Sequence, residues 1–263
     1  MSIEVLAIIQ ARMSSTRLPG KVLMKILGKP MLELQIERIQ QSVEINHLIV
    51  ATSFEVEDDP IENLCVKIGL PCFRGPLDDV LDRFFQAANT YQPKHIVRLT
   101  GDCPLADPEI IDRVIRLHRK KGYDYTSNIA PPTWPDGMDV EVLRFFCLKE
   151  AATEARLPSE REHVTPFILN RPKRYNCGNL QNDQNLSFHR LTVDEVNDFD
   201  KAKQIFKSLY PKNSRFSLND ILYLLDNKPA ISMINAKVDS NAGIREAKNK
   251  DREYLLKREN YDT

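Results

Sequence analysis

The chain has 263 residues, and its 37 lysine plus arginine residues match its 37 aspartate plus glutamate residues, so the formal net charge is zero. This balance argues against a dedicated nucleic-acid-binding protein, and 42% apolar with 28% charged residues excludes disordered and collagen-like chains. The first apolar run, Val5 to Ile9, is too short for a signal peptide or a membrane span. Five cysteines without a C-x-x-C pair are typical of a reducing compartment, so we expect a cytoplasmic protein that binds neither nucleic acid nor membrane.

The first half of the chain alternates between strand and helix patterns. Short apolar runs predict strands at Val5–Ile9, His47–Ala51, Cys72–Phe73 and His95–Leu99. Between and after them, helices are predicted from Pro30 to Ile39, from Pro60 to Gly69, from Asp78 to Tyr91 and from Pro108 to Gly122. Strands separated by crossover helices predict an α/β fold with a mostly parallel sheet covered by helices on both faces.

Beyond Ser127 the alternation ends. Residues 129–138 are rich in proline and are predicted to form a loop, while Asp139–Phe146 is expected to be a strand that points away from the main sheet. Leu186–Val193 alternates apolar and polar residues and is predicted to be a half-buried strand. Helices are predicted near residues 148–156, 160–169, 199–209 and 218–226. We expect one domain over residues 1–235, with an irregular segment at 128–172, followed by a charged tail or exposed helix at 236–263.

The segment that follows the first predicted strand, from Gln10 to about Lys29, is predicted to be a loop and is strongly basic. Gln10 to Lys29 contains no acidic residue and five basic ones, Arg12, Arg17, Lys21, Lys25 and Lys29. Ligands of open parallel sheets bind beyond the carboxyl ends of the strands, where this segment lies. Fixed cations, the hydroxyls of residues 14–16 and the permissive backbone of Gly20 suit a polyphosphate. The spacing matches neither a Walker A loop nor a dinucleotide fingerprint, and a solvated basic loop is the alternative interpretation.

Two aspartates follow predicted strands. Asp102 follows the strand that ends at Leu99, and such a carboxylate is suited to hold Mg²⁺ against phosphate oxygens. It could instead cap the next helix, but Asp107 is the better candidate for that role. Asp194 would complete a metal-binding pair if the two strand ends meet. The neighbouring Cys103 has no basic partner near it in sequence, so we interpret it as a packed thiol and not as a nucleophile.

A second polar group lies in the irregular segment. Asp136, Asp139 and Glu141 stand within six residues, and Arg161 and His163 follow later. Carboxylates can form hydrogen bonds to sugar hydroxyls, and an arginine or histidine can bind an acceptor carboxylate. The alternative interpretation is a charged turn followed by an exposed helix start.

These residues belong to an ordered series of motifs. The series begins with Gln10–Lys21 (QARMSSTRLPGK) and continues with Gly28–Pro30, Ala51–Thr52, Phe73–Gly75, Asp79–Leu81, Thr100–Pro104, Pro135–Glu141, Arg161–His163 and Thr192–Glu195. Over residues 5 to 225 it resembles the spore coat polysaccharide biosynthesis protein F family, a relative of the 3-deoxy-manno-octulosonate and acylneuraminate cytidylyltransferases. Val196 departs from the pattern, because the family often has proline there.

The resemblance implies the nucleotide-diphospho-sugar transferase fold and a Mg²⁺-dependent transfer of CMP from CTP to a sugar acid of the nonulosonic type, with release of pyrophosphate. It implies catalytic roles for Arg12, Lys21 and Asp102, and Mg²⁺ binding by Asp102 and Asp194. The nucleotide would bind to Ala11, Arg12, Ser15, Thr16, Arg17, Lys21, Arg74, Arg83 and Thr100. The acceptor would bind to Asp136, Asp139, Glu141, Arg161 and His163.

Three alternatives remain open at this point. One is a glycosyltransferase of the same fold, although the dense basic loop favours a triphosphate over a nucleotide sugar. Another is nucleotidyl transfer to a phosphate or phosphonate acceptor, which the acidic residues 136–141 would repel. The third is a degenerate, non-enzymatic relative. Residues 128–172 also resemble the dimerising insertion of related enzymes, so the resemblance leaves a homodimer as one open state of assembly.

Overall fold

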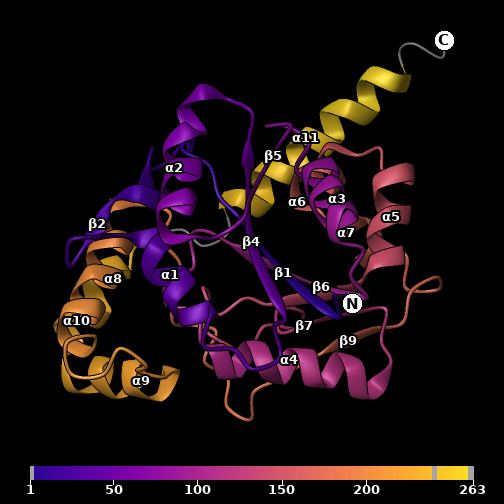
Figure 1. Cartoon of the computed structure of the whole chain (residues 1–263). Coiled ribbons are helices and arrows are strands. Elements are labelled where there is room, and N and C mark those ends of the chain that lie inside the picture. The colour runs from indigo at the N-terminus through magenta and orange to yellow at the C-terminus, as the bar shows by residue number, and fades with distance from the viewer. Residues whose placement is uncertain (1–2, 239–241, 260–263) are drawn as a thin grey trace.

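A seven-stranded sheet forms the centre of the computed structural model, which describes residues 3–238 and 242–259 (Figure 1). Its strand order is β5-β4-β1-β6-β8-β7-β9. The strands are β1 (Val5–Gln10), β4 (His47–Ser53), β5 (Cys72–Gly75), β6 (His95–Thr100), β7 (Tyr125–Ser127), β8 (Glu141–Arg144) and β9 (Cys177–Asn179). Of these strands only β8 runs antiparallel to its neighbours. The predicted mostly parallel sheet is therefore confirmed.

Helices cover both faces of this sheet. One face carries α1 (Met31–Ile39), α2 (Asp59–Ile68), α4 (Pro108–Lys121), α8 (Val196–Leu209) and α9 (Leu218–Asn227). The other carries α3 (Val80–Tyr91), α5 (Phe145–Glu154) and α7 (Pro166–Leu169). In β1, Val5, Ala7 and Ile9 belong to the first core, whereas Leu6 and Ile8 belong to the second. Successive side chains of a strand point to opposite faces, so a strand buried on both faces reads as a continuous apolar run.

The helix ends follow local sequence signals. Helix α4 starts at Pro108, and the Asp107 side chain caps it by accepting from the amide of Glu109 at 2.9 Å. The helix ends at Gly122, which adopts φ +66°, a conformation that L side chains rarely take. The role of Asp107 as an N-cap is thereby confirmed, which leaves Asp102 without a capping function.

The basic segment after β1 is more structured than expected. It contains the short 3₁₀ helix η1 (Lys21–Leu23) and a two-stranded hairpin of β2 (Lys25–Ile26) and β3 (Lys29–Pro30). The prediction of a continuous loop through Lys29 was therefore wrong in its second half. The side chain of Ile26 is fully buried in the first core, which explains why the hairpin packs against the domain.

Residues 139–146 contain the expected strand, β8 at Glu141–Arg144, but its expected position was wrong. Their strand, β8, does not point away from the main sheet but lies inside it, between β6 and β7. Val142 and Leu143 are both fully buried, and they belong to opposite cores. Burial on both faces is the physical reason why this strand is inserted in the sheet.

Residues 186–193 do not form the predicted strand. They contribute only one isolated bridge, between Arg190 and Asp136. The alternation that suggested a half-buried strand does not correspond to one buried face, because Phe188 is 75% exposed while Leu191 is buried.

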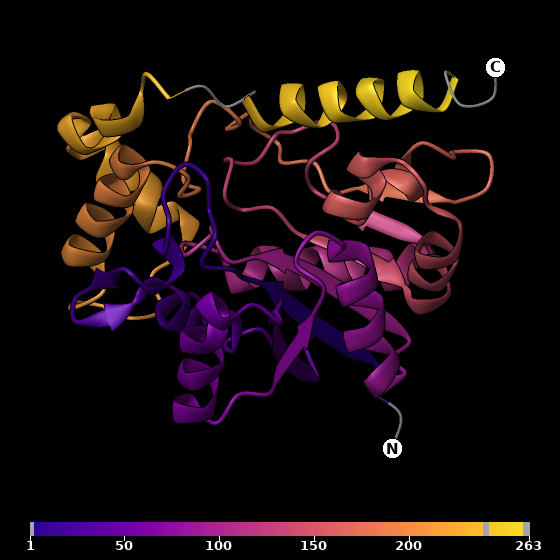
Figure 2. The same ribbon diagram turned by 90° about the horizontal axis from the view of Figure 1, so that it is seen from above.

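The remaining helices are short, apart from the last one in the chain. They are η2 (Val56–Asp58), α6 (Pro158–His163), α10 (Pro229–Ser232), η3 (Met233–Asn235) and α11 (Ala242–Glu259). The predicted tail from residue 236 onward includes α11, a charged helix that packs on α6 and crosses one side of the molecule (Figure 2, yellow). Among the described residues, no helix combines the length and apolar character needed to cross a membrane. The division into one domain and a tail stays a prediction.

Candidate active site

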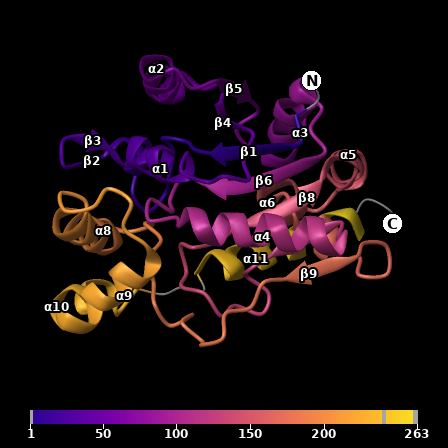
Figure 3. The same ribbon diagram turned by 60° about the horizontal axis from the view of Figure 1, so that its bottom comes forward.

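A cavity of about 800 Å³ lies beyond the carboxyl ends of β1 and β6. These strands are parallel neighbours whose last residues, Gln10 and Thr100, are paired in register (Figure 3). The segments that follow them therefore emerge side by side at one edge of the sheet, which is where open α/β sheets bind ligands. Of the predicted nucleotide residues, the cavity is lined by Ala11, Arg12, Ser15, Thr16, Arg17, Lys21, Arg83 and Thr100.

Lys21 lines this cavity and contacts two carboxylates of the lining. Its Nζ donates to Asp194 Oδ1 at 3.0 Å, to Asp102 Oδ2 at 3.3 Å and to the carbonyl of Val193 at 2.7 Å. Burial lowers the pKa of the Lys21 ammonium, but the two carboxylates raise it by more, so the group stays charged. Gly20, with φ +71°, provides the left-handed turn that leads into η1 and thus places Lys21 here.

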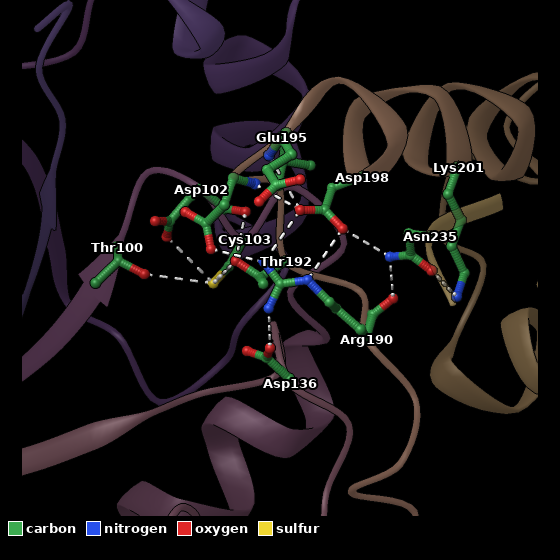
Figure 4. A network of polar contacts seen from close by, with 12 residues as sticks. Thr100, Asp102, Cys103, Asp136, Arg190, Thr192, Glu195, Asp198, Lys201 and Asn235 are labelled. Atoms are coloured by element: carbon green, nitrogen blue, oxygen red, sulfur yellow. Dashed lines mark hydrogen bonds and ion pairs between the residues drawn. The ribbon is translucent and has the colours of Figure 1, made fainter. Parts of the chain in front are cut away.

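Arg190 binds the carboxylate oxygen of Asp194 that Lys21 does not contact. The guanidinium of Arg190 donates to Asp194 Oδ2 at 2.8 Å, to Asp136 Oδ2 at 2.7 Å and to both oxygens of Asp198 at 3.0 Å. Figure 4 shows it between Asp136 and Asp198. Asp198 also accepts from the backbone amide of Asp194 at 3.0 Å. The orientation of Asp194 is therefore set by a buried network that sequence reasoning did not find.

Asp102 and Asp194 form a suitable pair for a divalent cation. Both carboxylates converge on the Lys21 ammonium, so their oxygens already surround one position of positive charge. Burial raises the pKa of Asp102, but the charge of Lys21 and the hydroxyl of Thr100 lower it by a larger amount, so the carboxylate stays ionised. Within the described part of the chain, no group of three or more His, Cys, Asp or Glu residues could hold a metal by itself. Two carboxylates suit Mg²⁺ that also binds phosphate oxygens.

Cys103 is a packed thiol, which confirms the interpretation of the sequence. The residue is 4% exposed, and its Sγ lies 3.3 Å from the Thr100 hydroxyl. Burial and the nearby carboxylate of Asp102 raise the pKa of the thiol well above its ordinary value. A thiol that keeps its proton at neutral pH is a poor nucleophile.

Arg83 and Arg74 have different surroundings. Arg83 lines the cavity, donates to the carbonyls of Pro76 and Leu77, and has an Nε without a partner among the described residues. Burial and the nearby Arg12 lower the pKa of Arg83 to about 10. Arg74 does not line the cavity: its guanidinium binds Asp59 at 2.6 Å and Glu62 at 2.9 Å on α2. The structure thus does not bring Arg74 together with the other predicted nucleotide residues.

The predicted acceptor residues separate into two groups. Arg161 and His163 line the cavity, and Arg161 Nε donates to Asp79 at 2.9 Å. Asp136, Asp139 and Glu141 are not part of its lining.

The three carboxylates of residues 136–141 differ in their surroundings. Glu141 is 3% exposed, forms an ion pair with Arg98 and accepts from the hydroxyls of Tyr125 and Thr165 at 2.7 and 2.6 Å. Burial, together with the charges of Asp136 and Glu141, raises the pKa of Asp139 to about 8. Glu141 is therefore held inside the protein by its partners, whereas Asp136 is paired with Arg190 and Asp139 stays half-buried. An acceptor-binding role of these three residues stays a prediction.

Several cavity residues were missed from the sequence. Arg98 lines the cavity from β6 and has an unpartnered Nε within the described region. The signal for it was present, because Arg98 is the one arginine or lysine inside the buried run of residues 95–99. Ala247 and Lys250 line the cavity from α11, and no local signal indicated them.

The chain matches known proteins over most of its length. Residues 6–231 match the family described as Cytidylyltransferase. The spore coat polysaccharide biosynthesis protein SpsF of Bacillus subtilis is 35% identical over 233 residues, which cover 86% of this chain and 95% of that protein. A solved cytidylyltransferase of Leptospira borgpetersenii superposes with a TM-score of 0.83 at 33% identity, over 88% of this chain and 97% of the other.

A more distant structure shares only the fold. A CMP:2-keto-3-deoxy-manno-octonic acid synthetase complexed with CTP superposes with a TM-score of 0.61 at 17% identity, over 78% of this chain and 99% of the other. The nucleotidyltransferase-type fold that the motifs predicted is thereby confirmed.

Proposed function

Because the chain belongs to the cytidylyltransferase family, we propose that it transfers CMP from CTP to a sugar acid of the nonulosonic type and releases pyrophosphate, as a step in surface polysaccharide synthesis. The observation that carries this proposal is the convergence of the basic loop and two carboxylates in one cavity. Arg17 and Lys21 both contact Asp194, and Lys21 also contacts Asp102. Cations beside a carboxylate pair suit a triphosphate that arrives with a divalent metal.

The reaction would proceed by attack of an acceptor oxygen on the α-phosphorus of CTP, in line with the departing pyrophosphate. Arg12, Arg17 and Lys21 would stabilise the negative charge that develops on the phosphate oxygens. Positioning of the two substrates in one cavity contributes the rest. Mg²⁺, held by Asp102 and Asp194, would add positive charge and make the bound acceptor hydroxyl more acidic.

Lys21 would change partners when the nucleotide binds. In the structure its ammonium forms ion pairs with both Asp102 and Asp194. A triphosphate brings several negative charges within reach of the same ammonium, and the ion pairs of Arg190 keep Asp194 oriented during the exchange. The rigid support of Asp194 is therefore part of the proposed mechanism.

The acceptor would bind at the side of the cavity lined by Arg98, Arg161 and His163. A sugar acid carries a carboxylate, and guanidinium groups bind carboxylates in a bidentate manner. Transfer to a phosphate acceptor is the second candidate, because residues 136–141 lie outside the cavity lining and their repulsion of a dianion is reduced by Arg98 and Arg190.

A pyrophosphate-release assay tests the proposal. Purified protein is given CTP, UTP, ATP or GTP with Mg²⁺ and a panel containing 3-deoxy-manno-octulosonate, N-acetylneuraminate and sugar phosphates. Release with CTP and a sugar acid, lost with a chelator and in Asp102→Asn, is the expected result. Release only with sugar phosphates favours the second candidate, and no release with any combination of nucleotide and acceptor contradicts both.

A further inference from the structure

The helix α11 supplies a side of the cavity that the matched family region does not contain. That region ends at residue 231, whereas α11 spans Ala242–Glu259. We propose that α11 is the outer wall of the acceptor compartment and that Lys250 binds the acid group of the acceptor. This inference rests on the proposed function and extends it to the recognition of the second substrate.

Specific polar contacts attach α11 to α6. Asp251 accepts from both the backbone amide and the hydroxyl of Ser159, at 2.8 and 2.6 Å. One residue before it, Lys250 donates to Glu162 Oε2 at 3.0 Å. The two contacts lie at the two ends of α6 (Pro158–His163), so they fix the direction in which α11 crosses it.

This attachment turns one face of α11 toward the cavity. Ala247 and Lys250, three residues apart, both line it, and residues at this spacing lie on the same face of a helix. Pro158, Arg161, Glu162 and His163 of α6 line the same side. The small side chain of Ala247 leaves space, whereas Lys250 contributes a charge.

Lys250 completes a basic cluster together with Arg98 and His163. Burial lowers the pKa of the His163 imidazole, the carboxylates of Glu162 and Glu141 raise it, and the charges of Arg98 and Lys250 lower it, so both cations lie near His163. The three residues come from β6, α6 and α11. None belongs to the basic loop that carries Arg12, Arg17 and Lys21, so the positive charge of the cavity lining is not confined to that loop.

Two cations of this cluster, Arg98 and Lys250, line the cavity and can approach an anionic group of a ligand there. Arg98 is paired with Glu141 and Lys250 with Glu162, so each cation is held in place by a carboxylate. Lys250 is 43% exposed on its side chain, which permits contact with a bound molecule. A sugar acid whose hydroxyl lies near the α-phosphate can extend its carboxylate toward this cluster within one cavity of about 800 Å³.

Three variants of the full-length chain test this inference. Lys250→Met removes the charge and keeps the length of the side chain, and Lys250→Arg keeps the charge. Lys257→Met is the matched control, because Lys257 is exposed on the same helix and does not line the cavity. The Michaelis constants for CTP and for the sugar acid are measured separately, with 3-deoxy-manno-octulosonate and N-acetylneuraminate as probes.

We expect Lys250→Met to raise the KM for the sugar acid about tenfold while the KM for CTP stays within about twofold. Lys250→Arg and Lys257→Met should both stay close to the wild type. An unchanged KM for the sugar acid in Lys250→Met, or an equal rise for CTP, overturns the role of Lys250 while the proposed function stands. If the wild type binds CTP but uses neither probe, the proposed acceptor class fails, and the inference fails with it.

Discussion

The Nζ of Lys21 lies 3.0 Å from Oδ1 of Asp194, across 173 positions of sequence. This contact joins the basic loop after β1 to the segment that precedes α8, and the same ammonium reaches Asp102 after β6. Three segments that are far apart in the chain therefore meet at the ammonium group of Lys21. The Lys21 ammonium lies between two carboxylates, and a divalent cation and a triphosphate would rearrange these ion pairs. Lys21 is therefore the most informative residue to change.

Lys21→Met should lower turnover by about 10²-fold or more, because it removes a cation that stabilises charge on the transferred phosphate. Lys25→Met is the matched control, since Lys25 is an exposed residue of the same basic segment. The variant should also bind Mg²⁺ alone more tightly than the wild type, because the metal no longer competes with the ammonium. Turnover is measured by pyrophosphate release and metal binding by calorimetry. Equal turnover in the two variants contradicts the role of Lys21.

Arg190→Met should destabilise the fold by about 3–5 kcal/mol, the usual cost of leaving buried charges without their partner. Arg190 binds Asp136, Asp194 and Asp198, and its side chain is 9% exposed. Arg174→Met, at an exposed ion pair with Glu154, should cost far less. Urea unfolding measures both.

Arg190→Lys is a milder change that tests whether Arg190 positions Asp194. It keeps a charge, but one ammonium cannot reproduce the planar fork that binds several carboxylates. We expect a folded protein with a weaker affinity for CTP in the presence of Mg²⁺. Wild-type affinity in this variant would show that Asp194 needs no such support.

Arg83 and Arg74 should respond differently to the loss of charge. Arg83→Met should weaken CTP binding, since Arg83 lines the cavity. Arg74→Met should leave CTP affinity within about twofold of the wild type, because its guanidinium is bound to Asp59 and Glu62 outside the cavity. Calorimetric titration with CTP compares the two variants. A large loss in Arg74→Met alone would reverse this assignment.

Asp139→Asn should change how stability depends on pH. Burial raises the pKa of Asp139 from 3.8 to about 8 in the folded protein. Between about pH 4 and pH 8 the folded state keeps a proton that the unfolded state has lost, so the unfolding free energy of the wild type falls as the pH rises. Asparagine does not titrate, so the Tm of the variant should rise relative to the wild type from pH 5 to pH 8. Parallel profiles, recorded with a chelator present, would contradict the raised pKa.

The part of the fold that the sequence predicted depends on local patterns. Burial and capping act within a few residues. They therefore made it possible to predict the strands β1, β4 and β6 from their apolar runs and the start of α4 from Asp107–Pro108. The position of β8 in the sheet could not be predicted, since an apolar run does not indicate which strands it pairs with. Residues 186–193 were misread for a related reason: alternation indicates a strand only when one face is buried, and Phe188 is exposed.

The candidate site shows the same division. The basic loop and Asp102 were predicted because each follows a strand whose end could be located. Asp194 was predicted to follow a strand at residues 186–193, which the structure does not form. Arg98 was overlooked inside an otherwise apolar strand. Lys250 could not be predicted, because its place at the cavity depends on the contact with Glu162, which lies 88 positions away in the chain.

The most direct test of the proposed CTP site is thermal unfolding with CTP, UTP, ATP or GTP, each with and without Mg²⁺. A ligand at about 100 times its Kd should add about 2.7 kcal/mol to the free energy of unfolding, which gives a clear rise in Tm. We predict a rise that is largest for CTP and increases with Mg²⁺. No rise with any triphosphate, or an equal rise with all four, would contradict a CTP site built by the basic loop, Asp102 and Asp194.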